Sequence, residues 1–179
     1  ERSFGNKTTW DTPFEEWFRS FAEEANNAVF NNSQHNCAIN SDILAISDEH
    51  DLVYIDPPYL SAQGVGVDYW EFYHFLEGLT MYDEWKEHID FKSKHHRLKR
   101  RASEWTNKQL IGSAFEKVFQ KSQNSIIVVS YRSDGIPSIE ELVALLQKYK
   151  RNVRVEQYGQ YRYVLSANEE TQEMLLIGE

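Results

Sequence analysis

Asp56, Pro57, Pro58 and Tyr59 form the stretch whose residue types best fit chemistry on an amino group. The exocyclic NH2 of a planar base or an amide is a poor nucleophile, because its nitrogen lone pair is delocalised. A carboxylate and a carbonyl that both accept from this NH2 favour a tetrahedral nitrogen with a free lone pair. Asp56 offers the carboxylate, Pro57 offers the carbonyl, and the Tyr59 ring can stack on a planar base. The four residues therefore predict a site that activates an amino group.

A short apolar strand is predicted to hold this motif at the edge of a sheet. Residues 53–55 are β-branched or aromatic, and the two prolines end the strand because neither has a backbone N–H to donate. In an open α/β sheet, ligands bind at the carboxyl ends of the strands. Asp56 is thus predicted to face a ligand site. The alternative is a strand that merely ends in an acidic proline turn.

Asp-Pro-Pro-Tyr after an apolar strand resembles the catalytic motif of amino-group methyltransferases that use S-adenosylmethionine. Three later segments, residues 130–136, 161–166 and 173–177, are similar to elements that follow this motif in Dam-like adenine-specific DNA methyltransferases. The resemblance implies an α/β fold with a Rossmann-like sheet, mostly parallel and ending in an antiparallel hairpin. It also implies S-adenosylmethionine as methyl donor, double-stranded DNA as partner, and an adenine flipped out of the duplex.

Individual roles follow from the same resemblance. Asp56, Pro57, Pro58 and Tyr59 would be catalytic, and Asp42, the Ile43 backbone and Asp56 would contact the cofactor. The sequence leaves a second interpretation open for Asp42, in which it only caps a short helix over residues 43–46.

The dense basic run at residues 92–101 is the predicted DNA contact. A net charge of −9 argues against binding nucleic acid with the whole surface, so positive potential must be concentrated. We expect contact with the DNA backbone; a solvated helix face is the alternative. Tyr161 and Arg162 are predicted to shape the base pocket, or else to be plain edge-strand residues. The predicted DNA-binding side chains are Lys94, Arg97, Lys99, Arg100, Arg101, Tyr161 and Arg162.

Composition limits the remaining possibilities. A chain of 179 residues with 41% hydrophobic residues suits one globular domain. No apolar stretch is long enough to suggest a membrane span, and no histidine spacing suggests a metal. Cys37 is the one cysteine, which fits a reducing cytoplasm and indicates a small core residue.

Periodicity predicts the other elements. An aromatic stripe predicts a helix over residues 13–29 that packs in the core, and residues 69–88 predict two helical pieces around Gly78. A helix is expected at 105–120, a buried parallel strand at 125–130, and a helix from Ser138, capped with Glu141, to about residue 149. Strands are predicted at 152–157, 161–166 and 172–178.

The chain departs from the family pattern because it lacks the Phe-x-Gly-x-Gly cofactor loop, and it begins with Glu1. We therefore expect a partial catalytic domain, with a helical segment at 1–35 and a catalytic core portion at 36–179. Such a fragment would be inactive alone and completed by a missing N-terminal part or a second chain. The parent would act in restriction-modification or DNA marking. The alternatives are a non-catalytic DNA-binding fragment and a methyltransferase acting on adenine in RNA.

Overall fold

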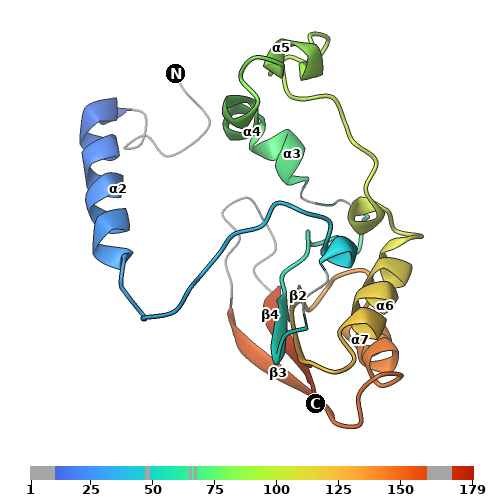
Figure 1. The fold of residues 1–179 in the computed structure, drawn as a ribbon. Coiled ribbons are helices and arrows are strands. Elements are labelled where there is room, and N and C mark those ends of the chain that lie inside the picture. The colour runs from blue at the N-terminus through green and yellow to red at the C-terminus, as the bar shows by residue number, and fades with distance from the viewer. Residues whose placement is uncertain (1–10, 47–48, 65, 67, 161–170) are drawn as a thin grey trace. The chain divides into compact units, whose positions relative to one another are not determined.

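The structure is a computed structural model that describes residues 11–46, 49–64, 66, 68–160 and 171–179. It divides into two compact units, Glu1–Asn40 and Ser41–Glu179 (Figure 1), each of which is described by itself. Tyr161, Arg162 and the strand predicted at 161–166 lie outside the described residues.

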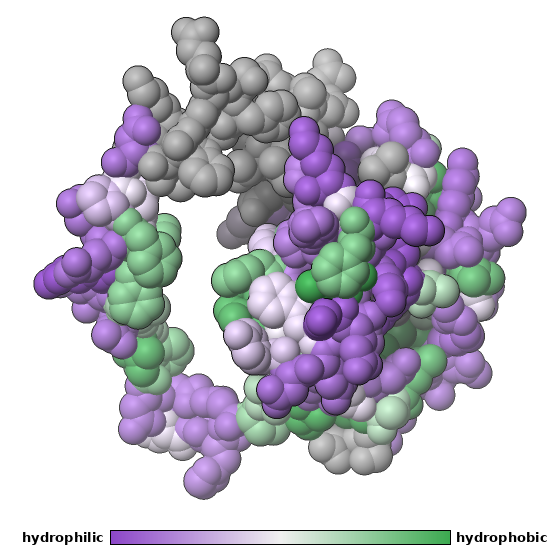
Figure 2. Space-filling view, turned by 90° about the horizontal axis from the view of Figure 1, so that it is seen from above, coloured by the Kyte–Doolittle hydropathy of each residue, from purple (hydrophilic) through white to green (hydrophobic). Residues whose placement is uncertain are grey.

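The first unit contains helix α2, Phe14–Ala28, which agrees with the predicted helix. Its aromatic rings lie in stacked pairs, with centroids 6.1 Å apart for Phe14 and Phe18 and 5.2 Å apart for Trp17 and Phe21. Apolar side chains run along one side of α2 in Figure 2. No residue of α2 is buried, however, so the prediction that this stripe lies in a core is wrong. Among the described residues of this unit, 11–40, α2 has no second helix or strand against which to pack.

Cys37 belongs to the extended segment that follows α2. Its side chain is exposed, so the prediction of a small core residue is wrong as well. The same physical reason applies, because no described residue of the first unit covers Cys37.

The second unit is built on a four-stranded sheet with the order β1-β2-β4-β3. The strands are β1, Leu52–Ile55; β2, Ile126–Arg132; β3, Val153–Gln160; and β4, Gln172–Gly178. Strands β1 and β2 are parallel, whereas β4 is antiparallel to both β2 and β3. A mostly parallel sheet was expected, and this is wrong for the described strands. Two of the four come from the C-terminal hairpin, and β4 lies between β2 and β3.

Helices α6, Ile111–Lys121, and α7, Ile139–Leu146, lie on one side of this sheet (Figure 1). The predicted capping box of α7 is confirmed, since the Ser138 side chain accepts from the Glu141 N–H and the Glu141 carboxylate accepts from the Ser138 N–H. The core between helices and strands contains fully buried Phe115, Phe119, Ile127, Val129, Tyr131, Leu142, Leu146 and Leu176. Each such side chain contributes about 1.5–3 kcal/mol by leaving water, so this core holds β2 and with it β1.

The described part of the second unit also contains five short helices. They are η1, Ile43–Ala45; α3, Tyr69–Phe72; α4, His74–Thr80; α5, Trp85–His88; and η2, Glu104–Thr106. Gly78 lies inside α4 and does not separate two helices as predicted. A Cβ at Gly78 would lie 2.0 Å from Cε2 of Trp85, so the glycine is there for close packing of α5.

None of the helices in the described part of the chain combines the length and the apolar composition that crossing a membrane requires.

Candidate active site

Asp56 lies at the carboxyl end of β1, as the sequence predicts. The strand ends at Ile55, which is buried and pairs in register with Val129 of β2. Asp56 itself is exposed, whereas the following Pro57 is buried. Among the described residues, no ion pair involves Asp56, so its carboxylate oxygens remain able to accept hydrogen bonds from a ligand.

A pocket of about 430 Å³ opens beside Asp56. Its volume is in the range of small-molecule sites, about 300–1,000 Å³. The lining residues are Ser41, Asp42, Ile43, Tyr54, Ile55, Asp56, Pro57, Pro58 and Trp105. The structure therefore brings together all three residues that were predicted to contact a cofactor. They lie in one cavity with Pro57 and Pro58, two further residues of the Asp-Pro-Pro-Tyr motif.

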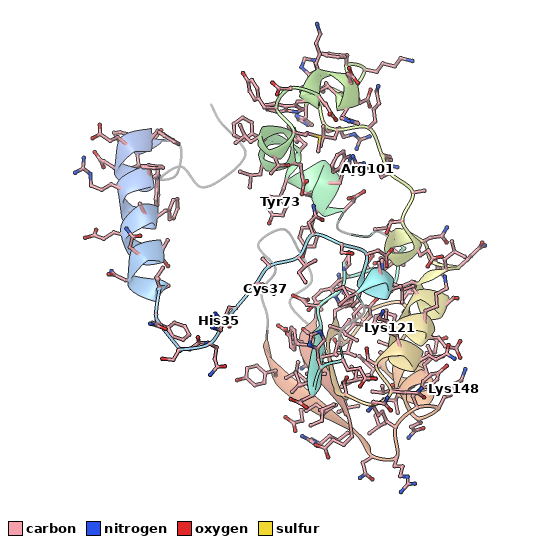
Figure 3. All side chains as sticks on the ribbon, in the orientation of Figure 1. His35, Cys37, Tyr73, Arg101, Lys121 and Lys148 are labelled. Atoms are coloured by element: carbon pink, nitrogen blue, oxygen red, sulfur yellow. The ribbon has the colours of Figure 1, made fainter. Side chains whose placement is uncertain are left out.

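Asp42 caps η1 while it lines this pocket. One of its carboxylate oxygens, Oδ1, accepts from the Leu44 N–H at 2.7 Å. The helix-capping interpretation is thus correct, and it is compatible with a position in the pocket wall. The ammonium of Lys121 on α6 donates to the Leu44 carbonyl at 2.7 Å, which ties η1 to the core (Lys121 is labelled in Figure 3).

Trp105 is a pocket residue that the sequence analysis did not identify. It lies in η2, where the Ser103 hydroxyl accepts from its backbone N–H at 3.2 Å. Its ring packs edge-on against Phe115, with centroids 5.2 Å apart and planes at 80°. The sequence predicts Trp105 as the first residue of a helix at 105–120, and only the fold places it in the same pocket as Asp56.

Tyr59 is half-buried and does not line the pocket. Its hydroxyl lies 2.7 Å from the Ser130 hydroxyl on β2. Its ring meets Tyr131 edge-on, with centroids 5.4 Å apart. The motif turn is also joined by its backbone to the loop after β2, since the Ile136 N–H donates to the Leu60 carbonyl at 2.9 Å.

The loop after β2, residues 133–137, is held by hydrogen bonds from the last two residues of that strand, Tyr131 and Arg132. The Tyr131 hydroxyl donates to the Ile136 carbonyl, and burial raises the pKa of Tyr131 to about 12, so this donor stays neutral. Arg132 donates to both carboxylate oxygens of Asp134, at 2.6 and 2.9 Å. These hydrogen bonds from Arg132 lower the pKa of the Asp134 carboxyl. The loop supports the motif turn from the β2 side.

The basic run does not form a helix, so a solvated helix face is not what the structure contains. Arg97 and Arg100 both pair with Glu71 of α3, at 2.7 and 2.6 Å. The Arg101 guanidinium, labelled in Figure 3, lies 3.2 Å above the ring of Trp70 in α3. The run therefore packs against α3.

Two lysines of the run, Lys94 and Lys99, were also predicted to contact DNA. Lys99 donates to the Glu87 carbonyl of α5 at 2.7 Å, and Lys94 is exposed. One carboxylate, Glu71, faces two guanidiniums, so the cluster keeps a positive excess. Contact of these residues with DNA remains a prediction.

In the described part of the chain, no group of three or more His, Cys, Asp or Glu side chains gathers closely enough to hold a metal ion.

The combination of an Asp-Pro-Pro-Tyr turn after a parallel strand with a second carboxylate in the same pocket indicates the amino-group methyltransferases as a class. The family model described as D12 class N6 adenine-specific DNA methyltransferase matches residues 2–159 of the chain. The chain belongs to this family.

Several modification enzymes are similar to the chain. Type II methyltransferase M2.HphI of Haemophilus parahaemolyticus is 31% identical over 145 residues, which are 79% of this chain and 38% of that enzyme. Modification methylase LlaI of Lactococcus lactis subsp. lactis is 33% identical over 99 residues, 55% of this chain and 15% of that enzyme. Type II methyltransferase M.FokI of Planomicrobium okeanokoites is 30% identical over 123 residues, 68% of this chain and 18% of that enzyme.

The chain thus spans well under half the length of these relatives. No solved structure matches the chain with significant similarity.

Proposed function

We propose that the enzyme carrying this chain transfers a methyl group from S-adenosylmethionine to N6 of adenine in double-stranded DNA. The observation that carries this proposal is the pocket in which Asp42 and Asp56 lie together with the two motif prolines. Family membership supports the choice of adenine in DNA. The printed names of the relatives, modification methylases and Type II methyltransferases, support a role in restriction-modification.

The chemical character of the pocket fits S-adenosylmethionine. Asp42 and the Ile43 backbone would hold the polar edge of the cofactor, and the half-buried Trp105 offers a planar apolar wall for its adenine. When bound, the cofactor supplies an electrophilic methyl group. The Asp56 carboxylate at the pocket edge would also be close to the positive charge of the sulfonium, which favours binding of this cationic ligand.

The amine side of the reaction depends on the motif turn. Asp56 and the Pro57 carbonyl would accept the two N–H bonds of the adenine amine, which directs the nitrogen lone pair away from the ring plane and toward the methyl group. Pro57 is buried and has a fixed φ, so its carbonyl needs little reorganisation. Positioning would supply most of the acceleration. The proton leaves the nitrogen after transfer, and the exposed Asp56 carboxylate is the nearest acceptor in the turn.

Access to the amine requires the target adenine to leave the duplex, at a cost of a few kcal/mol. Tyr59 would stack on the flipped base, with Tyr161 and Arg162 as further parts of the base pocket. The basic run, residues 92–101, would contact phosphates and so set affinity and salt dependence, not sequence choice. A DNA substrate and the single cysteine favour a cytoplasmic location.

At the level of the fold, we propose that residues 36–179 are part of a Rossmann-like methyltransferase domain and that residues 1–35 are a helical segment preceding it. The parallel pair of β1 and β2, with the motif at the carboxyl end of β1, supports this assignment.

The test is methyl transfer from labelled S-adenosylmethionine to adenine-containing duplex DNA by the enzyme that carries this chain. Asp56→Ala should lower kcat by at least about a hundredfold, because a group that stabilises charge in the transition state is removed. Asp51→Ala is the matched control, since Asp51 is an exposed aspartate at the opposite end of the same strand. Methylation of adenine that survives Asp56→Ala at the wild-type rate would refute the role of Asp56, and absence of adenine methylation by the wild-type enzyme would refute the proposed function.

A further inference from the structure

Tyr59, Ser130 and Glu173 form a chain of hydrogen bonds that links the motif turn to two strands. The Tyr59 and Ser130 hydroxyl oxygens lie 2.7 Å apart, and the Ser130 hydroxyl donates to Oε1 of Glu173 at 2.7 Å. Ser130 lies on β2 and Glu173 on β4, two strands that pair directly. Ser130 is fully buried, so water does not compete for its hydroxyl.

The Glu173 carboxylate determines which group donates in each hydrogen bond of this series. An ionised carboxylate only accepts hydrogen bonds, so the Ser130 proton must point toward Glu173. The Ser130 oxygen then presents its lone pairs to Tyr59, and the Tyr59 hydroxyl must be the donor. A phenol O–H lies near the plane of its ring, so this fixed direction also restricts rotation of the ring.

Two further contacts restrict the same ring. The Tyr59 ring meets the fully buried Tyr131 ring edge-on, with planes at 78°. The next residue, Leu60, is fully buried and accepts at its carbonyl from the Ile136 N–H. The hydroxyl end, one ring edge and the following backbone are therefore all held, although Tyr59 remains partly accessible.

We propose that Ser130 and Glu173 are positioning residues for the methylation, which orient the Tyr59 ring so that the extruded base stacks on it in a productive pose. This inference rests on the proposed function. Neither residue touches the base; they act through the Tyr59 hydroxyl. Orienting the ring before the base arrives removes an ordering step from the reaction.

The kinetic test uses the enzyme that carries this chain. Ser130→Ala should lower kcat/KM for DNA by about tenfold, because a rate change of this size corresponds to the loss of one hydrogen bond. Tyr59→Phe, which keeps the ring and removes the hydroxyl, should cost a similar factor. The double variant should lose no more than either single one, because both changes break the same link.

A matched pair of variants at Glu173 separates the role of the acceptor from that of the fold. Glu173→Gln keeps a carbonyl oxygen that can accept from Ser130, so its activity should remain close to that of the wild type. Glu173→Leu has a similar size without an acceptor and should reproduce the loss seen for Ser130→Ala. Thermal unfolding of every variant shows whether a loss reflects stability alone.

Base stacking itself can be followed with 2-aminopurine in place of the target adenine. Stacking on an aromatic ring quenches its fluorescence, so complexes of Ser130→Ala and Glu173→Leu should be brighter than the wild-type complex at equal DNA affinity. The Tyr59 ¹³Cζ resonance, identified by its loss in Tyr59→Phe, should shift in both variants and not in Glu173→Gln.

The outcomes distinguish the two proposals. A wild-type enzyme that does not methylate adenine would refute the proposed function and, with it, the role on the base. Normal wild-type methylation with unchanged kinetics and fluorescence in Ser130→Ala would refute the positioning role alone.

Discussion

Asp56 keeps its carboxylate available because the residues around it satisfy their hydrogen bonds elsewhere. Asp42, the second carboxylate of the pocket, uses one oxygen to cap η1 and thereby stays in the pocket wall. Asp134, in the loop that supports the motif turn, forms an ion pair with Arg132. The three aspartates thus differ in their local partners: Asp56 has no ion pair among the described residues, Asp42 caps a helix, and Asp134 pairs with an arginine.

Asp134→Asn should reduce the stability of the second unit in a pH-dependent way. The Arg132 hydrogen bonds lower the pKa of Asp134 below 3.8, so folding favours the ionised form. A lowered pKa stabilises the fold above the unfolded-state value, and this contribution disappears as the pH falls through the folded-state value. We expect a loss of about 1 kcal/mol at pH 7. The difference from the wild type should shrink below about pH 4, as measured by urea unfolding across pH.

Glu156→Gln is the control for that experiment. Glu156 also pairs with an arginine, Arg154, but both side chains are 52% exposed. Exposed pairs of this kind contribute little to stability. Equal losses in the two variants would show that the Arg132–Asp134 pair has no special role in the loop.

At the scale of elements, the motif turn depends on the loop after β2. Ile136 and Gly135 of this loop lie against Leu60 and Ser61, the residues that follow Tyr59. The turn therefore lies between its own strand, β1, and the loop that follows the neighbouring parallel strand. In a parallel pair, the carboxyl ends of both strands meet at the same edge, which is why two segments about 75 residues apart share one site.

Gly135→Ala should destabilise the fold, because the added methyl group would clash with the Tyr131 ring. The added Cβ would lie 2.4 Å from Cε1 of Tyr131, and Tyr131 is a fully buried core residue whose ring has no space to move. We expect a loss of about 1–3 kcal/mol, the usual cost of overpacking. Thermal or urea unfolding measures it.

Gly112→Ala is expected to raise the free energy of unfolding, which is the opposite effect. At Gly112, near the start of α6, the nearest atom to a Cβ is 4.0 Å away, which is an ordinary contact. Alanine is favoured over glycine inside a helix, so the chain should gain about 0.5–1 kcal/mol. If both variants destabilise the chain equally, the argument from the Tyr131 contact does not hold.

At the scale of the whole molecule, charge is unevenly distributed. The chain carries −9 overall, while the basic run gathers its cations beside α3. Arg100 remains 74% exposed in its pair with Glu71, so it can reach an anionic partner without leaving the surface. Uneven charge of this kind suits a protein that binds a polyanion at one place and repels it elsewhere.

Arg100→Gln should flatten the salt dependence of DNA binding. Loss of one phosphate contact reduces the slope of log K against log salt by about 1. Fluorescence anisotropy with duplex DNA at a series of salt concentrations measures this slope. Arg154→Gln is the control, because Arg154 is also an exposed, ion-paired arginine but lies on β3. Equal slopes for Arg100→Gln and the wild type would exclude Arg100 as a phosphate contact.

The sequence by itself was sufficient for the features that neighbouring residues determine. The end of β1 just before Asp56, the capping box of Ser138 and Glu141, and the extent of α2 were predicted and are confirmed. Each depends on groups within a few residues of one another, such as the missing N–H of Pro57 or the hydroxyl of Ser138. Features that depend on local sterics and hydrogen bonding can therefore be predicted from the sequence.

Only the tertiary structure decided which distant groups meet. It placed Trp105 in one pocket with Asp56, joined Tyr59 to Ser130 and Glu173, and paired the basic run with Glu71. It also made β4 antiparallel to β2, against the expectation of a mostly parallel sheet. These contacts depend on which apolar faces bury one another. The same alternation of apolar residues is compatible with several strand orders and directions, and only the packed core selects one.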